Sequence, residues 1–141
     1  MSDTRSPLPV DITRRRFLQG TALAGTAAFL AATKFAEHCS PDTRIVVLVD
    51  FENDSVRTAL EVARALRDRL WGVRLDTSRS LVDRALWEEM GDFDPRGVNE
   101  RLVRKVRDAL DHDGFERVKI VVSGGFDLDR IRAFEERNVP V

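Results

Sequence analysis

The sequence has few of the side chains that build a structural metal site or a cross-linked fold. Its single cysteine, Cys39, excludes an internal disulfide framework and a zinc site made of several cysteines. The chain has 2 histidines, His38 and His112, and each is predicted near a helix end. A structural metal centre is therefore not expected.

The chain also lacks an excess of charge of either sign. Its 23 basic and 24 acidic residues leave a formal net charge of -1 at pH 7. This balance provides no general attraction to nucleic acid or to an anionic membrane, so we expect no nucleic-acid partner. A length of 141 residues, 43% of them hydrophobic and 33% charged, fits one ordinary globular domain.

Charged residues are absent from Phe17 to Thr33, a run that begins after the paired arginines Arg14 and Arg15 and one further residue, Arg16. The hydroxyl residue Thr13, the arginine pair, a Phe-Leu step and a mildly apolar run together resemble a twin-arginine export signal. This resemblance implies contact with the export machinery through the two arginines. The apolar run is shorter than the ~20 residues of a membrane-spanning helix. The other interpretation is an amphipathic or buried helix at the start of the domain.

A helical pattern over residues 29–38 places Phe29, Ala32, Phe35 and Ala36 on one face, which could pack on the domain. We interpret residues 1–33 as a disordered N-terminus with a signal-like segment. Residues 34–141 are interpreted as the folded α/β domain.

Three apolar stretches, at 44–49, 71–76 and 117–122, alternate with segments of helical periodicity. Alternating strands and helices indicate a parallel sheet with right-handed crossovers. We therefore predict an α/β fold, a partial parallel (β/α) barrel of about three β/α units, preceded by the signal-like helix. The apolar positions that define the first and third helical stripes are Val56, Ala59, Leu60, Ala63 and Leu66, and Val98, Leu102, Val106 and Leu110.

Each predicted strand ends at polar residues or at a polar, glycine-containing loop. The first is followed by Asp50, the second carries Arg74 and Asp76, and the third enters Ser123-Gly124-Gly125. Ligands bind at the carboxyl ends of the strands in parallel α/β folds, so we expect these ends to form one site. Asp50 could instead cap the following helix, the Arg74–Asp76 pair could brace the fold internally, and the glycine pair could simply make a turn. Amides of the glycine loop, aided by the dipole of the next helix, would suit a phosphate.

Three stretches that carry these residues, at 47–55, 70–78 and 119–126, resemble the nicotinate phosphoribosyltransferase family. They read VLVDFENDS, LWGVRLDTS and KIVVSGGF. The similarity is to the barrel domain of the bacterial and archaeal branch and covers about residues 32–141. The related quinolinate phosphoribosyltransferase family is a poorer match at the strand with arginine and aspartate.

The resemblance implies a reaction that joins nicotinate to 5-phosphoribosyl 1-pyrophosphate, forming nicotinate mononucleotide and pyrophosphate in NAD biosynthesis. It implies Mg²⁺ as cofactor and, in many members, ATP as co-substrate. Asp50, Arg74 and Asp76 would be the catalytic residues. Arg74 would contact phosphate or the stacked base, Asp76 would hold ribose hydroxyls, and Asp50 would orient the Mg²⁺-pyrophosphate end as the metal residue. The implied substrate-binding residues are Thr77, Ser123, Gly124 and Gly125, the last three at the 5-phosphate.

Family members are cytoplasmic homodimers with sites completed across the interface, and they carry an N-terminal domain and early barrel strands. Because these parts have no counterpart in this sequence, we expect a fragment or fusion that lacks a complete catalytic site alone. The competing hypothesis is an exported, non-catalytic α/β protein that reuses the barrel segment for packing or partner binding. The twin arginines favour export, whereas the strand-end motifs favour the phosphoribosyltransferase.

Overall fold

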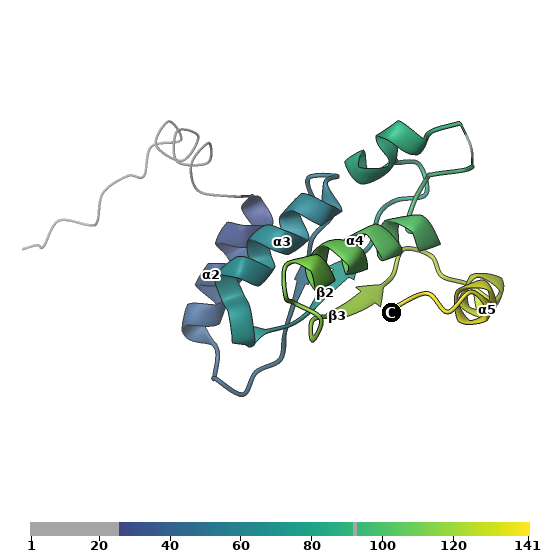
Figure 1. The fold of residues 1–141 in the computed structure, drawn as a ribbon. Coiled ribbons are helices and arrows are strands. Elements are labelled where there is room, and N and C mark those ends of the chain that lie inside the picture. The colour runs from purple at the N-terminus through teal and green to yellow at the C-terminus, as the bar shows by residue number, and fades with distance from the viewer. Residues whose placement is uncertain (1–25, 92) are drawn as a thin grey trace, which may run out of the picture.

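The computed structural model describes residues 26–91 and 93–141, which form a small parallel sheet with helices around it (Figure 1). Residues 1–25, with Arg14 and Arg15, lie outside the described part, so the signal-like segment stays a prediction. The elements in chain order are α2 (Ala27–His38), β1 (Ile45–Leu48), α3 (Ser55–Leu66), the 3₁₀ turn η1 (Arg67–Arg69), β2 (Leu70–Leu75), the 3₁₀ helix η2 (Arg84–Glu89), α4 (Glu100–His112), β3 (Lys119–Val122) and α5 (Leu128–Glu136).

The sheet has the order β1-β2-β3, and β2 pairs in parallel with both neighbours. The parallel direction is possible because a helix returns the chain after each strand, α3 between β1 and β2 and α4 between β2 and β3. The predicted fold class, an α/β fold with a partial parallel β/α arrangement, is confirmed.

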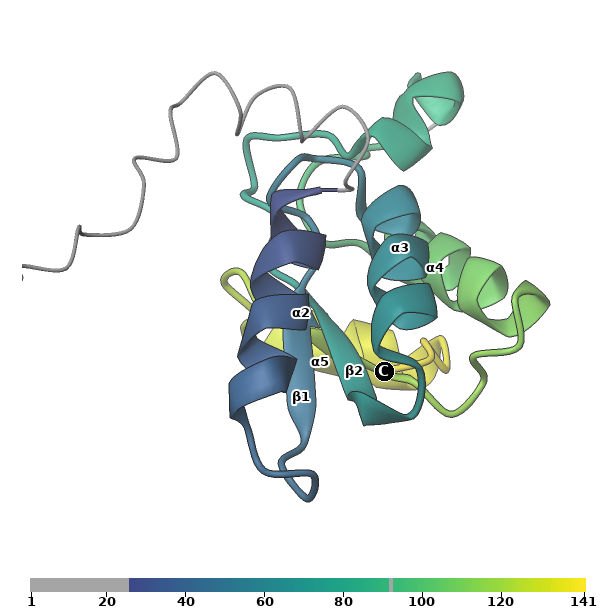
Figure 2. The same cartoon turned by 90° about the vertical axis from the view of Figure 1, so that its left-hand side faces the viewer.

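Helices α2, α3 and α4 lie side by side over one face of the sheet (Figure 2). The predicted stripe of α4 is fully buried, and most of the α3 stripe is buried as well. On β1, Ile45 and Val47 point into this layer, whereas Val46 and Leu48 are 42% and 37% exposed. β1 is therefore buried on one face only, because no described element covers the opposite face.

Several large apolar side chains are exposed. Trp71 and Trp87 are 37% and 51% exposed, and each ring lies beside an arginine guanidinium, of Arg44 and Arg84 respectively. Helix α5 contains no fully buried residue, and its Leu128 is 68% exposed. These residues are apolar in sequence, but the described part of the chain covers them only in part.

Helix α2 forms part of the domain's helical layer. Its N-cap Thr26 accepts a hydrogen bond from the Phe29 amide at 3.2 Å, and Ala32 is buried against the core. The expected boundary between residues 33 and 34 falls inside this helix. Within residues 26–91 and 93–141, no helix is both long and apolar enough to cross a membrane.

A fully buried carboxylate, Asp83, joins two elements that are distant in sequence. One oxygen, Oδ2, accepts hydrogen bonds from the Ser55 amide at 3.0 Å and the Ser55 hydroxyl at 2.6 Å. The other, Oδ1, accepts from the Ala85 amide at 2.9 Å. Asp83 therefore supplies the hydrogen-bond acceptor at the start of α3 and caps η2, whereas Asp54, which directly precedes α3, makes no side-chain capping bond.

We predict that Asp83→Ala lowers the free energy of unfolding by about 2–4 kcal/mol, because it leaves buried donors at Ser55 and Ala85 without an acceptor. The measurement is chemical denaturation followed by circular dichroism. Asp108→Ala, at an exposed aspartate of α4, is the matched control and should stay within about 0.5 kcal/mol of wild type. Equal losses in the two variants would contradict the role assigned to Asp83.

Candidate functional site at the strand ends

The parallel register aligns the polar strand ends in one row. Leu48, Arg74 and Val121 are direct neighbours across β1, β2 and β3. Two residues further along each strand, on the same face because side chains alternate, are Asp50, Asp76 and Ser123. The structure thus brings the three predicted strand ends to one edge of the sheet, on the face that the helices leave uncovered. We refer to this edge, residues 50, 74, 76–77 and 123–125, as the rim.

Asp50 ties the end of β1 to the end of β2. Its Oδ2 accepts hydrogen bonds from the Asp76 amide at 2.7 Å and from the Thr77 hydroxyl at 2.6 Å. Thr77 is only 4% exposed, so its hydroxyl is engaged inside the rim. The capping alternative for Asp50 finds no support, because the amide of Ser55 at the start of α3 donates to Asp83.

Arg74 and Asp76 share a face of β2, as the sequence predicted. The Nη2 of Arg74 lies 3.3 Å from Oδ2 of Asp76, and the two side chains are 45% and 37% exposed. A solvent-exposed pair of this kind adds little to stability. Both groups face solvent, so they remain accessible to a ligand, in contrast to the internal brace that was the alternative.

The loop after β3 is pinned against β2. Both the amide and the hydroxyl of Ser123 donate to the Leu75 carbonyl, at 2.8 and 3.2 Å. Gly124 and Gly125 follow with φ values of +88° and +75°, a left-handed backbone that favours glycine. A Cβ at Gly124 would lie 3.0 Å from Oδ1 of Asp76, so glycine also permits the close approach of the two strand ends.

Successive backbone amides in a turn can form a concave surface that suits anions. The amides of Gly124, Gly125 and Phe126 donate to no acceptor within the described part of the chain. The expected help from the dipole of α5 is reduced, because Asp127 already caps that helix by accepting from the Arg130 amide at 2.9 Å. The anion-binding potential of this loop therefore lies in the glycine amides.

Arg79 is a rim neighbour that the sequence analysis did not single out. Its Nη2 donates to the Gly125 carbonyl and lies 3.5 Å from Oδ2 of Asp127, so it links the loops after β2 and β3. The amide of Arg130 and the guanidinium of Arg79 together lower the pKa of Asp127 below its ordinary value. Arg79 is one of several arginines in polar surroundings, and no local pattern separates it from them.

The rim offers two carboxylates, which is too few for a metal site made entirely of protein ligands. No three His, Cys, Asp or Glu side chains gather in metal-binding geometry among residues 26–91 and 93–141. Mg²⁺, however, commonly binds one or two carboxylates together with substrate phosphates. Asp50 fits this use, because its Oδ1 accepts no hydrogen bond from the described residues.

A comparison with solved structures finds a similar fold. The chain is similar to the crystal structure of nicotinate-nucleotide pyrophosphorylase from Pyrococcus furiosus, with 30% sequence identity and a TM-score of 0.59. The match covers 80% of this chain and 25% of the Pyrococcus protein, so this chain spans about a quarter of that protein's length. No family model and no curated protein matches the sequence.

We predict that Gly124→Ala destabilises the fold more than Gly114→Ala does. Both substitutions force alanine into a left-handed backbone, which costs about 1–2 kcal/mol, but only the Cβ at position 124 meets the Asp76 carboxylate. Unfolding free energies of both variants, alone and combined with Asp76→Ala, measure the difference. The excess at position 124 should shrink in the Asp76→Ala background, and an unchanged excess would refute the contact.

We also predict that Arg79→Ala raises the pKa of Asp127 toward its ordinary value of 3.8 without restoring it, because the Arg130 amide remains. A folded-state pKa below the unfolded value stabilises the fold at pH above the unfolded value, and this contribution is lost as the pH falls through the folded pKa. Carboxyl ¹³C NMR titration measures the shift. Arg132→Ala, at an exposed arginine of α5, is the control and should leave the Asp127 titration unchanged.

Proposed function

We propose that the rim binds the phosphoribosyl part of a substrate and that the chain is part of a pyridine-nucleotide phosphoribosyltransferase that joins nicotinate to 5-phosphoribosyl 1-pyrophosphate. The observation that carries this proposal is the juxtaposition of Asp76 and the Gly124-Gly125 loop, a carboxylate beside free backbone amides at the ends of adjacent strands. The neighbour's name supports it, since a pyrophosphorylase of nicotinate nucleotide acts on a pyridine nucleotide and pyrophosphate.

The two groups match the two ends of a ribose 5-phosphate. A carboxylate accepts hydrogen bonds from neighbouring sugar hydroxyls, and Asp76 is exposed enough to receive them. Backbone amides bind a phosphate without needing a charged side chain, and those of Gly124 and Gly125 are free to do so within the described structure. Arg74, beside Asp76, would bind a second phosphate or stack on the pyridine ring.

The proposed chemistry breaks the bond between ribose C1 and the pyrophosphate oxygen and forms a bond from C1 to the pyridine nitrogen. The nitrogen lone pair supplies the new bond, and pyrophosphate leaves with the electron pair of the old one. Such a step needs alignment of the reactants and stabilisation of separating charge more than a protein nucleophile. The rim would contribute alignment of the ribose and the phosphate, and Arg74 would contribute positive charge beside them.

Mg²⁺ would enter as the ion carried by pyrophosphate, with Asp50 as a protein ligand through Oδ1. When bound, the ion would neutralise charge on the departing pyrophosphate. Asp50 would at the same time keep Asp76 in place through its Oδ2. Dimer formation, ATP coupling and location in the cell stay predictions of the family resemblance.

We predict that phosphoribosyl pyrophosphate with Mg²⁺ raises the thermal stability of the full chain, by about 2.7 kcal/mol at a ligand concentration one hundred times Kd. Asp76→Ala should abolish the gain, because it removes the ribose contact. Asp108→Ala should retain it. A wild-type chain that shows no shift at millimolar ligand, or an Asp76→Ala variant with the full shift, would refute the proposed site.

Ribose 5-phosphate tests the part of the site that binds the sugar and the 5-phosphate separately from the part that binds pyrophosphate. It carries the sugar and the 5-phosphate but no pyrophosphate, so its binding should not depend on Mg²⁺. Binding of phosphoribosyl pyrophosphate should weaken when Mg²⁺ is chelated, and Asp50→Asn should reduce this difference. Calorimetric titration with and without chelator measures both. A requirement for Mg²⁺ with ribose 5-phosphate would contradict the assignment of the ion to the pyrophosphate end.

A further inference from the structure

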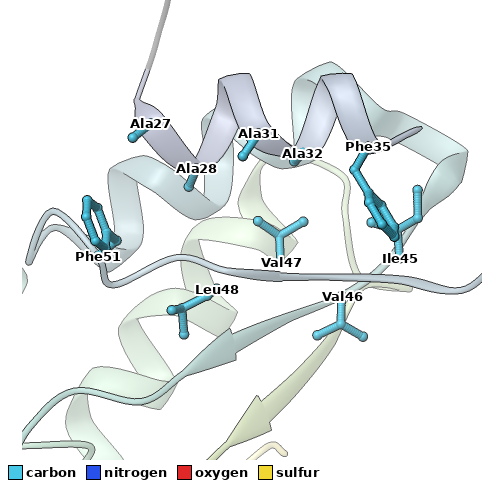
Figure 3. Close-up of a pocket in the computed structure, with 10 residues that line it drawn as sticks. All are labelled: Ala27, Ala28, Ala31, Ala32, Phe35, Ile45, Val46, Val47, Leu48 and Phe51. Carbon is cyan, nitrogen blue, oxygen red and sulfur yellow. The ribbon is translucent and has the colours of Figure 1, made fainter. Parts of the chain in front are cut away.

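An apolar groove runs along the free edge of β1, beside helix α2 (Figure 3). It has a volume of about 500 Å³ and is lined by apolar side chains, among them Ala28, Ala31, Phe35, Val46, Leu48 and Phe51. Residues from both faces of β1 take part, since Ile45 and Val47 point into the helical layer and Val46 and Leu48 point away from it. The groove therefore follows the edge of the strand and does not lie over one face.

The edge of β1 also offers unused backbone hydrogen bonds. Among the described residues β1 pairs only with β2, and the Val49 amide donates to the Arg74 carbonyl on that side. Amides alternate in direction along a strand, so those of Val46 and Leu48 point to the free edge. A free, apolar strand edge attracts another extended segment.

Helix α2 begins at one end of this groove. The Thr26 amide donates to Oε2 of Glu61 at 3.0 Å, and the Ala27 amide donates to Oε1 of Glu52 at 2.8 Å. These bonds fix the start of α2 near Phe51, at the carboxyl end of β1, while the helix ends near Ile45 (Figure 3). The chain therefore reaches Thr26 at the groove's Phe51 end.

We propose that Phe17–Gly25 of this same chain occupies the groove as an extended segment parallel to β1. A segment that ends at Thr26 and lies in the groove must run in the direction of β1, and α2 is then the crossover helix of a β-α-β unit. The segment is free of charge and longer than the 4 residues of β1. The alanines of α2 that face the groove leave room for its side chains.

The covalent connection favours this occupant over a second copy. A segment tethered at the mouth of the groove has an effective concentration in the millimolar range, far above that of a second chain in solution. Docking would also place Phe17, which follows the paired arginines, against the domain. The export machinery and the groove would then compete for the same stretch of sequence.

Residue-resolved amide hydrogen exchange on the full chain tests the proposal. With the segment docked, the Val46 and Leu48 amides should exchange about tenfold more slowly, or slower still, than in Ala31→Trp, whose side chain fills the groove from an exposed position of α2. Ala65→Trp adds the same side chain to an exposed alanine of α3 and should keep the wild-type protection. Equally fast exchange at the two amides in wild type and Ala31→Trp would overturn the proposal.

Phe51→Ala provides a second variant should Ala31→Trp not fold. Phe51 is 75% exposed, so its truncation removes groove surface and leaves the core intact. It should accelerate exchange at Val46 and Leu48 but not at buried α4 residues such as Val106. Unchanged exchange at both edge amides in a folded Phe51→Ala variant would count against the proposal.

A spin label distinguishes the tethered segment from a second copy. The only cysteine is Cys39, so Cys39→Ala with Gln19→Cys gives one labelled position inside the segment. The label should broaden the amide signals of Val46 and Leu48 when the label and the ¹⁵N nuclei are in the same chain. Broadening in a mixture of labelled ¹⁴N chains and unlabelled ¹⁵N chains would instead identify the occupant as a second copy and overturn the proposal, as would no broadening in either sample.

Discussion

The parallel pairing of β2 with both β1 and β3 is the constraint on which the rest of the structure depends. Because all strands point the same way, their carboxyl ends meet at one edge, and the register sets Leu48, Arg74 and Val121 side by side. Every contact of the rim follows from this alignment. Asp50 can reach the Asp76 amide, and Ser123 can reach the Leu75 carbonyl, only because these residues come at matching positions after their strands.

The same alignment separates residues that hold the rim from those that remain available to a ligand. Asp50 through Oδ2, the Thr77 hydroxyl and Ser123 are all engaged in internal hydrogen bonds that fix the strand ends. The glycine amides are not used in this way. Asp76 donates its amide to Asp50, and its carboxylate pairs with an exposed side chain, that of Arg74. A loss of binding after substitution of Asp50 would thus combine structural and chemical effects, whereas Asp76 tests the chemistry more directly.

Much of this arrangement was predictable because it is indicated by patterns among neighbouring residues of the sequence. Helical periodicity revealed the buried faces of α3 and α4, and polar residues at the ends of apolar runs revealed the rim. Burial on only one face of β1 was not predictable, because a run of apolar residues looks the same whether one face or both are covered. The role of Asp83 also depends on a partner, Ser55, that lies 28 positions away. Capping rules based on neighbouring residues point instead to Asp54, the residue directly before α3.

The stretch from Phe17 to Thr33 shows how one local pattern serves two structural interpretations. A charge-free run of small and apolar residues suits an export signal, and it equally suits an element that packs on a domain. In the structure its C-terminal part packs on the domain, because Ala32 of α2 is buried and the Thr26 and Ala27 amides at the start of α2 donate to Glu61 and Glu52. Glu52 and Glu61, which accept these hydrogen bonds, are residues of the folded domain, so α2 packs as part of that domain. The packed helix in turn creates the groove at the edge of β1, and the preceding residues acquire a second potential binding partner within their own chain.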